Sequence, residues 1–350
     1  MSERAPVDEL GVRRLNREEE KYWSVEARAA ESQKLAYAVR DFVLCTLPFK
    51  QPAGTEYTRR NGDMTLKIHA SAQWGIPYGH DRLITIWLAT AFFAAGRPAD
   101  NVIRFRCASD ILRAFGLSAS GGKDLRQLRD RLQRVFFATY YLTFAGQSPM
   151  GVKGLAHNSY RLMDRLKMQF IDEKYSPVNQ HTLWSDHVRL DKTFADELRA
   201  GGRVPVDLET VRALKDCTPA LDLYIWQAWR SFRLARDHKP AVAIPVFGEG
   251  GLMQQLGSEA KSPKKIRAML RGWQAEVKRV WQGCPNYLDG DCGRFWVHPG
   301  NAIASQEKIP ILPGVSPTPP PVRELAGGNQ LVLIHDVDDP HALLEPPPET

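Results

Sequence analysis

The chain has few of the residues that mark secreted, membrane or metal-binding proteins. Its 350 residues include only five cysteines, which are scattered and form no Cys-x-x-Cys pair. An odd number of separated thiols is typical of a reducing compartment. No apolar run approaches the ~18 residues that a membrane helix needs, and the first residues lack the apolar core of a signal peptide. We therefore expect a cytoplasmic protein without membrane contact.

Three enzyme motifs are also missing. A phosphate-binding loop around Lys123 would need Gly at Leu117 and Ser or Thr at Asp124. A strand-nicking tyrosine would need metal-binding histidines close together, and no His-x-His pair occurs. Cys284, Cys292 and His298 would give zinc only three ligands. The sequence therefore predicts no enzyme, no metal site and no cofactor, and a nicking or priming enzyme is the weakest alternative.

Positive charge is concentrated in the body of the chain. The net charge is +7, but residues 301–350 contain seven acidic and two basic residues, so residues 1–300 carry +12. Such a basic body indicates a polyanionic partner. Anionic lipid would satisfy the charge equally well, but no amphipathic anchor helix accompanies it. Nucleic acid is the better interpretation.

The stretch from 103 to 144 predicts a strand, a short helix, a Gly-centred turn, a longer basic helix and a β-rich run. In the longer helix, Leu125, Leu128, Leu132 and Phe136 fall on one side. The other side carries Lys123, Arg126, Gln127 and Arg134. Arg and Gln have forked donors that match guanine and adenine edges in a major groove. The alternative is an ordinary solvated face.

The same pattern returns at a fixed offset of 141 residues, between 242 and 281. Ile103 aligns with Ile244, and Gly116 aligns with Gly257. The second long helix has Ile266, Leu270, Trp273 and Val277 on its apolar side, and Lys264, Arg267, Arg271, Gln274 and Lys278 opposite. A repeated supersecondary unit changes the fold prediction. Two basic helices on two similar units indicate a bipartite DNA clamp.

The predicted fold is α+β and mainly helical, with tandem winged helix-turn-helix domains. Residues 1–60 form an arm with a helix over 17–44, residues 61–200 the first domain, and residues 201–300 the second. Residues 301–350 form a Pro-rich, acidic, flexible tail. A strand is expected over 64–69 and a buried helix over 81–95. Strands 139–144 and 160–171, joined by a Gly-rich loop, form the first wing, and 286–288 with 294–298 the second.

Four segments carry a resemblance to a known family. They are GIPYGHDRLITIWLATAF, FGLSASGGKDLRQLRDRLQRVF, VPVDLETVRALKDCTPALDLYIWQAWRSFRL and LGSEAKSPKKIRAMLRGWQAEVKRV. With them the chain resembles the plasmid-encoded RepA-type replication initiators over most of residues 64–298. The resemblance implies two winged-helix domains that bind repeated sites, or iterons, at a plasmid origin of replication.

The resemblance also implies a function and partners. Such initiators help open the duplex, recruit a host initiator protein and the replicative helicase, and take part in plasmid copy control. They often form homodimers that repress their own gene. We expect the same of this chain, in a bacterial cytoplasm and associated with plasmid or nucleoid DNA. The alternative is a sequence-specific transcriptional repressor without initiator activity.

The candidate DNA-binding residues lie on both units. In the first unit they are Ser120, Gly121, Gly122, Lys123, Arg126, Gln127 and Arg134, with Lys153, Arg161, Arg165 and Lys167 in or beside the wing. In the second they are Lys261, Ser262, Lys264, Lys265, Arg267 and Arg271. Free backbone N–H groups after Ser120 suit a phosphate, although ordinary helix capping explains the same residues.

One further motif lies in the tail. Gln330, Leu331, Leu333 and Ile334 belong to a Gln-Leu-Val-Leu-Ile pentapeptide. It is similar to the Gln-Leu-x-Leu-Phe peptide by which bacterial proteins hold the polymerase sliding clamp, with Ile in place of the aromatic residue. An extended peptide on a tether can enter a groove in this way. The alternative is an apolar segment that packs back on the second domain.

Overall fold

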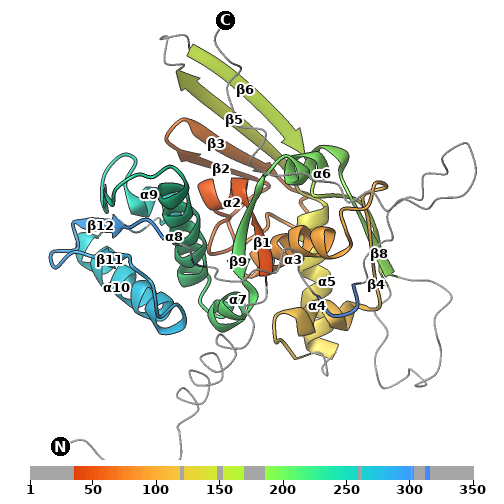
Figure 1. Cartoon of the computed structure of the whole chain (residues 1–350). Helices are drawn as coiled ribbons and strands as arrows, with labels where there is room; N and C mark the ends of the chain where they lie inside the picture. Colours follow the sequence, from red (N-terminus) through yellow and green to blue (C-terminus); the bar gives the residue numbers. More distant parts are fainter. Residues whose placement is uncertain are drawn as a thin grey trace, which may run out of the picture.

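The computed structural model describes residues 35–118, 122–147, 153–168, 186–258, 260, 262–300, 302 and 312–315, and within them the chain is α+β (Figure 1). The helices are α2 (Arg40–Leu44), α3 (Asp81–Ala94), α4 (Ala108–Ala114), α5 (Gly122–Phe136), α6 (Lys192–Arg199), α7 (Leu208–Leu214), α8 (Thr218–Arg236), α9 (Leu252–Leu256) and α10 (Pro263–Val280). The strands are β1 (Leu35–Val39), β2 (Glu56–Asn61), β3 (Met64–His69), β4 (Val102–Phe105), β5 (Thr139–Gln147), β6 (Lys153–Tyr160), β7 (Met163–Lys167), β8 (Asp186–Leu190), β9 (Arg203–Asp207), β10 (Val242–Pro245), β11 (Tyr287–Leu288) and β12 (Arg294–Val297).

These strands form antiparallel sheets with the orders β4-β8-β7, β10-β12-β11, β2-β3-β5-β6 and β1-β9. Two groups of elements have the same order along the chain. The first unit runs α3, β4, α4, α5, β7, β8, and the second runs α8, β10, α9, α10, β11, β12. In each three-stranded sheet the last strand lies between the other two. The repeat seen in the sequence is therefore a repeat of topology.

Two glycines mark the same place in both units. Gly116 follows α4 with φ +61°, and Gly257 caps α9 with φ +76°. Both conformations are left-handed, which costs glycine least because it has no Cβ. At Gly257 a Cβ would also meet the Arg59 guanidinium, so a larger residue there would require the Arg59 side chain to move.

The predicted first wing is wrong in its strand pairing. β5 pairs with β6, and this hairpin extends β3 and β2 into a separate four-stranded sheet. The predicted strand 160–171 is also wrong at its start, because β6 ends at Tyr160 and β7 begins at Met163. β7 pairs with β8 and closes the sheet that contains β4. A hairpin is thus inserted between α5 and the last two strands of the first unit. The second predicted hairpin, β11 with β12, is confirmed.

The predicted N-terminal helix is wrong for residues 35–39, and residues 17–34 lie outside the described part of the chain. The segment Leu35–Val39 is strand β1, with all five residues buried. It pairs antiparallel with β9, and in Figure 1 both strands lie between α3 and α8. A continuous apolar run fits a buried strand as well as a buried helix, and the pairing with β9 decides between them. Helix begins only at Arg40.

Helix α3 is buried along its whole length, as predicted. It packs against β1, α5 and β4 at the centre of the core. Among the described helices, none combines the length and the apolarity required to cross a membrane.

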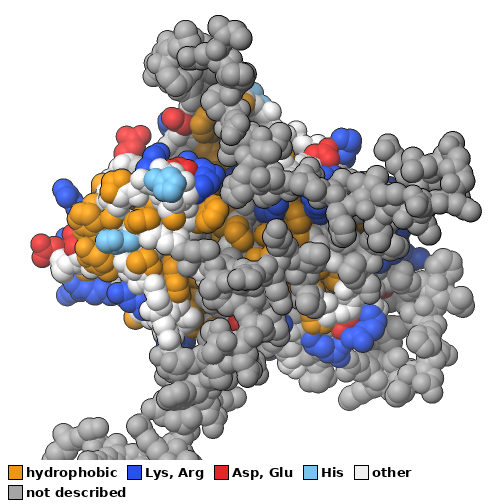
Figure 2. All heavy atoms as spheres, in the orientation of Figure 1, with side chains coloured by type: hydrophobic (Ala, Val, Ile, Leu, Met, Phe, Trp, Pro, Cys, Tyr) orange, Lys and Arg blue, Asp and Glu red, His pale blue; other side chains and the backbone are white. Residues whose placement is uncertain are grey.

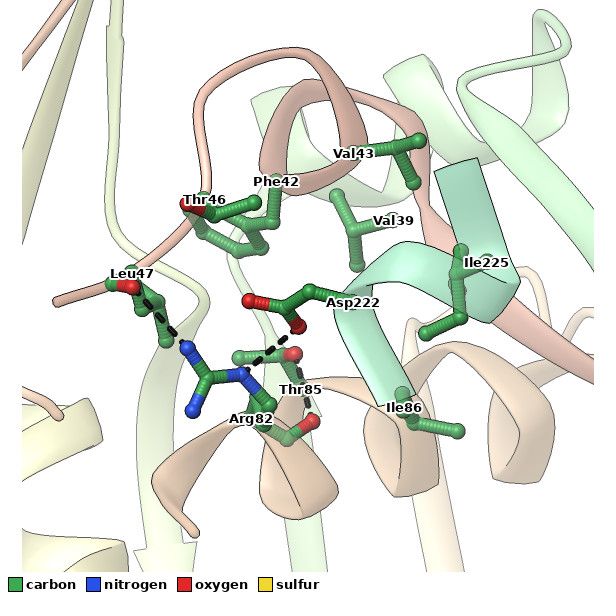
Figure 3. A pocket seen from close by; sticks show the side chains of 11 residues that line it. Val39, Phe42, Val43, Thr46, Leu47, Arg82, Thr85, Ile86, Asp222 and Ile225 are labelled. Carbon is green, nitrogen blue, oxygen red and sulfur yellow. Dashed lines mark hydrogen bonds and ion pairs between the residues drawn. The ribbon is translucent and has the colours of Figure 1, made fainter. Parts of the chain in front are cut away.

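Arg82, on α3, joins the two units through a buried ion pair (Figure 3). Its Nε lies 2.8 Å from Asp222 Oδ1 on α8, and its Nη2 donates to the Leu47 carbonyl at 2.9 Å. Asp222 Oδ2 has no hydrogen-bond partner among the described residues. Burial raises the pKa of Asp222 to about 6, although the Arg82 charge opposes the shift. The pair therefore fixes the position of α3 relative to α8, at the cost of desolvating two charged groups.

Further hydrogen bonds cross the same junction. Arg59 on β2 donates to the Gln255 carbonyl at 3.0 Å, and the Thr46 hydroxyl donates to the Leu256 carbonyl at 3.0 Å. Arg212 on α7 donates to the Ala114 carbonyl, which ends α4, at 2.7 Å. The second unit is thus bound to the four-stranded sheet and to the first unit.

Part of the predicted flexible tail is ordered against the first unit. Val315 forms an isolated antiparallel bridge with Phe105 on β4, and Leu312 is buried. The prediction is wrong for residues 312–315 because the Leu312 side chain is buried in the core and Val315 packs half-buried against it.

Replacing Arg82 by Leu should leave the buried Asp222 carboxylate without its partner. We expect the free energy of unfolding to fall by about 3–5 kcal/mol, measured by urea denaturation. The double variant Arg82→Leu/Asp222→Leu should recover most of the loss. A single variant as stable as the wild type would contradict the assigned role. Arg189→Leu, which breaks the exposed pair with Asp164, is the control and should leave the midpoint unchanged.

The raised pKa of Asp222 predicts a pH dependence. Its folded-state pKa of about 6 exceeds the unfolded value of about 4. The carboxyl therefore favours folding below pH ~4, and this contribution is lost as the pH rises through about 6. Asp222→Asn should remove it. The difference in unfolding free energy, wild type minus variant, should fall by about 3 kcal/mol from pH 4 to pH 7. If the unfolding free energies of the two proteins changed in parallel with pH, the assignment of this pH dependence to Asp222 would be refuted.

Candidate nucleic-acid interface

Helix α5 exposes most of its predicted contact residues. Its buried side is formed by Leu125, Leu128, Leu132 and Val135. Val135, not Phe136, completes the buried stripe, and Phe136 packs half-buried at the edge of the core. Leu125, Leu128 and Leu132 are buried as predicted. Lys123, Arg126 and Gln127 are exposed on the opposite side, where they can reach a ligand.

Arg134 has a partner inside the protein. Its Nε and Nη2 donate to the two carboxylate oxygens of Asp81 at 2.7 and 2.9 Å, and its guanidinium lies 4.9 Å from the centroid of the Tyr78 ring. The side chain is 16% exposed and that of Asp81 only 1%. Burial opposes the charge on Arg134, but the hydrogen bonds and charge of Asp81 raise its pKa overall. Arg134 is therefore a residue that holds α5 on α3, and we leave it out of the proposed contact surface.

Helix α10 buries the four predicted apolar residues, Ile266, Leu270, Trp273 and Val277. Its exposed side carries Lys264, Lys265 and Arg271, with Ser262 exposed at the N-cap. Arg267 is half-buried, and its guanidinium lies 5.3 Å from the centroid of the Phe247 ring. α10 thus offers a cationic surface with an apolar back.

Gln274 was expected on the polar side of α10, and that expectation is wrong. The side chain is buried, where its Oε1 accepts from Gln227 at 2.9 Å and its Nε2 donates to the Asn286 carbonyl at 3.0 Å. Both ends of the amide are satisfied, which allows a polar group in the core. Gln274 fixes α10 to α8 and to the chain before β11.

The predicted wing cations are divided between two sheets. Lys153 begins β6 in the four-stranded sheet, Arg161 lies exposed between β6 and β7, and Arg165 and Lys167 lie exposed on β7 in the sheet of β4. They therefore do not line one hairpin. Gly122 is the first residue of α5. Ser120, Gly121, Lys261 and the tail residues Gln330, Leu331, Leu333 and Ile334 lie outside the described residues.

Uncompensated positive charge is greater on α10 than on α5. On α5, Arg129 lies 3.3 Å from Asp130, and Arg134 is paired with Asp81. Within the described part of the chain, no carboxylate pairs with Lys264, Lys265 or Arg271, and Arg271 has only a long hydrogen bond to the Gly290 carbonyl. Figure 2 shows two separate groups of Lys and Arg side chains, one at the place that α10 has in Figure 1 and one near α4 and α5.

The described residues contain no cluster of three or more His, Cys, Asp or Glu residues that could hold a metal ion. Cys292 is buried, and the Cys284 thiol donates to Gln227 Oε1 at 3.3 Å. The cavity beside Arg82 is lined mainly by apolar side chains and belongs to the junction between the units.

Comparison with known proteins identifies the family. Residues 76–246 match the family model described as plasmid encoded RepA protein. This segment belongs to the plasmid-encoded RepA family. The resemblance inferred from the sequence is thus confirmed from the approach to α3 as far as the end of β10, and α9 and α10 lie beyond the match. No curated protein sequence matches the chain.

Two solved structures are similar to this chain at low sequence identity. A crystal structure of selenomethionine derivatives of domains 2 and 3 of RctB has a TM-score of 0.49 and 15% identity, covering 76% of this chain and 99% of that one. A second crystal structure of RctB domains 2–3 has a TM-score of 0.41 and 16% identity, covering 70% of this chain and 82% of that one.

The sequence did not reveal the polar contacts that hold α5 and the junction between the units. Asp81 and Arg82 are charged residues at the start of an otherwise apolar, fully buried helix. A buried charge requires a partner, so their presence in that helix was the available signal. It did not identify Arg134 and Asp222 as those partners.

Replacing Arg134 by Gln should reduce stability and spare DNA contact. We expect a loss of about 3 kcal/mol in the free energy of unfolding, because Asp81 remains buried without its cation. DNA affinity of the folded variant, measured by fluorescence anisotropy well below its unfolding midpoint, should stay within twofold of the wild type. Arg126→Gln is the matched control, and it should keep the wild-type stability and bind DNA more weakly. A stable Arg134→Gln variant with weakened binding would reverse the assignment.

Proposed function

We propose that the chain is a plasmid replication initiator that binds duplex DNA through two winged-helix units. The observation that carries the proposal is the repeated topology. Each unit has a helix, a strand, two helices and two strands, with the last strand central in the sheet. This is the order of a winged helix-turn-helix, whose second turn-linked helix enters a major groove. α5 and α10 both hold that position.

The chemistry of the two helices supports this role. Arg126 and Gln127 on α5 have the forked donors that pair with guanine and adenine edges. Lys264, Lys265 and Arg271 on α10, together with Lys123 on α5, supply phosphate contacts, and Arg165 and Lys167 on β7 are further cations of the first unit. Because α10 carries more uncompensated charge, it supplies more of the salt-dependent affinity, whereas α5 supplies more of the base reading.

Membership of the plasmid-encoded RepA family supports a role in plasmid replication. In this proposal the chain binds repeated sites at the origin, helps open the duplex, and recruits the host initiator protein and the replicative helicase. The same DNA-binding surface, on a homodimer, would repress the initiator's own gene. The tail peptide from Gln330 to Ile334 would contact the sliding clamp.

The proposal predicts a footprint with regular repeats. DNase protection on the replicon that carries this gene should show spaced sites at the origin, and Arg126→Ala and Arg271→Ala should each lose part of every site. Lys192→Ala, which removes an exposed cation of α6 outside both units, is the control. Protection confined to a promoter would favour the repressor, and protection without sequence preference would refute the two-helix model.

Arg126→Ala and Arg271→Ala should also differ in how they weaken DNA binding. Arg126→Ala should cost about 1–3 kcal/mol and relax specificity at one base pair, because a bidentate contact to guanine is lost. Arg271→Ala should weaken binding to all sequences and reduce the slope of log K against log salt by about 0.9. Anisotropy titrations over a salt series measure both quantities. An Arg126→Ala loss that is equal on every sequence would make Arg126 a phosphate contact.

A further inference from the structure

The C-terminal end of α8 carries a second group of cations, away from the exposed face of α10. Arg230 and Arg233 share one aromatic ring: their guanidinium carbons lie 5.3 and 5.2 Å from the centroid of Trp229. Arg230 also lies 5.6 Å from the centroid of Trp226. Arg233 is exposed, Trp229 and Arg230 are half-buried, and Phe232 beside them is 37% exposed. Two like charges are thus held on one indole.

No carboxylate among the described residues forms an ion pair with either guanidinium. Arg230 Nη2 donates to the Gln255 amide oxygen at 3.0 Å, and its Nε has no partner in the described part of the chain. The nearest acid along the helix, Asp237, lies 2.8 Å from Arg236 and 3.8 Å from Lys239. Burial, and then the charge of Arg233, lower the pKa of Arg230. The two guanidiniums therefore repel one another, and Asp237, whose charge reaches Arg233, is itself paired with Arg236.

Two arginines of the first unit have carboxylate partners. Arg134 is paired with Asp81, and Arg106 with Asp110. A cation with a carboxylate partner is neutralised before any ligand arrives. Arg230 and Arg233 instead lie on aromatic rings, which orient the planar guanidinium. The exposed Arg233 keeps its N–H donors available, whereas Arg230 has its Nε buried and its Nη2 bonded to Gln255. The pair has the charge and the donors of an anion-binding site that the protein itself does not fill.

We propose that Arg230 and Arg233 bind backbone phosphates of duplex DNA beside the second unit. This inference rests on the proposed function, and it extends the contact surface beyond α5 and α10. Arg230 reaches Gln255 on α9, the helix that precedes α10, so the pair lies beside the two-helix element that approaches the duplex. A phosphate contacting both guanidiniums would remove their repulsion, and Arg forks match phosphate oxygens. Such contacts carry no sequence preference.

The test compares Arg233→Gln with Arg236→Gln in the full-length chain. Both changes remove one charge from the same helix, but Arg236 is already paired with Asp237. The probes are the footprinted site alone and the same site with one further helical turn of duplex at each end. On the longer probe, Arg233→Gln should weaken binding about tenfold and lower the salt slope by about 0.9. Arg236→Gln should change affinity by less than about threefold.

The outcomes are distinguishable. Equal losses for Arg233→Gln and Arg236→Gln would reduce the effect to long-range charge and overturn the inference. An unchanged affinity of Arg233→Gln for the longer probe would also overturn the inference. So would an Arg233→Gln variant that no longer binds phosphatidylglycerol vesicles but binds DNA as the wild type does. Arg233→Glu, which reverses the charge, should weaken binding to the longer probe further. If the wild type itself protects no site and Arg126→Ala has no effect, the proposed function has failed instead.

Discussion

The ion pair between Arg82 and Asp222 sets the relation between the two basic helices. Arg82 extends from α3, the helix on which α5 packs, and Asp222 belongs to α8, the helix on which α10 packs. A charge that loses its partner while it stays buried is costly, so displacements of α3 against α8 that break the pair inside the core are disfavoured. The spacing of α5 and α10 is therefore a property of the core, and a duplex meets a pre-set pair of helices.

The sequence contained the information for the elements whose signal is local. The apolar period of α10 predicted all four of its buried residues, and the offset of 141 residues anticipated the repeated topology, because each depends on residues close together in the chain. β1 was mispredicted because its identity depends on a distant strand: Leu35–Val39 is a strand because β9 pairs with it. β6 was missed for a local reason, since Gly146 and Gly154, which indicate a loop in the sequence, pair with one another inside the β5–β6 hairpin.

Predicting the candidate site met a similar limit. A helical wheel divides α5 into an apolar and a polar side, but a guanidinium that reaches a buried carboxylate on another helix falls on the polar side too. Arg134 and Arg126 therefore look alike in the sequence and differ in the structure. Gln274 shows the converse, since an amide on the polar side of α10 is buried by a partner from α8. The exposed cations can be predicted as a class, and their individual partners cannot.

The pairing of β1 with β9 has a consequence for how the chain folds. The strand at residue 35 cannot form until the chain beyond residue 203 has been synthesised, and the bridge to Phe105 requires the chain as far as Val315. Contacts between such distant residues slow folding, because loop-closure entropy is lost before they form. The β1–β9 sheet therefore forms only when both halves of the chain are present. Cutting the chain between residues 39 and 203 would leave β1 and β9 without their partners, whereas substitutions in the intact chain can separate the roles of its two helices.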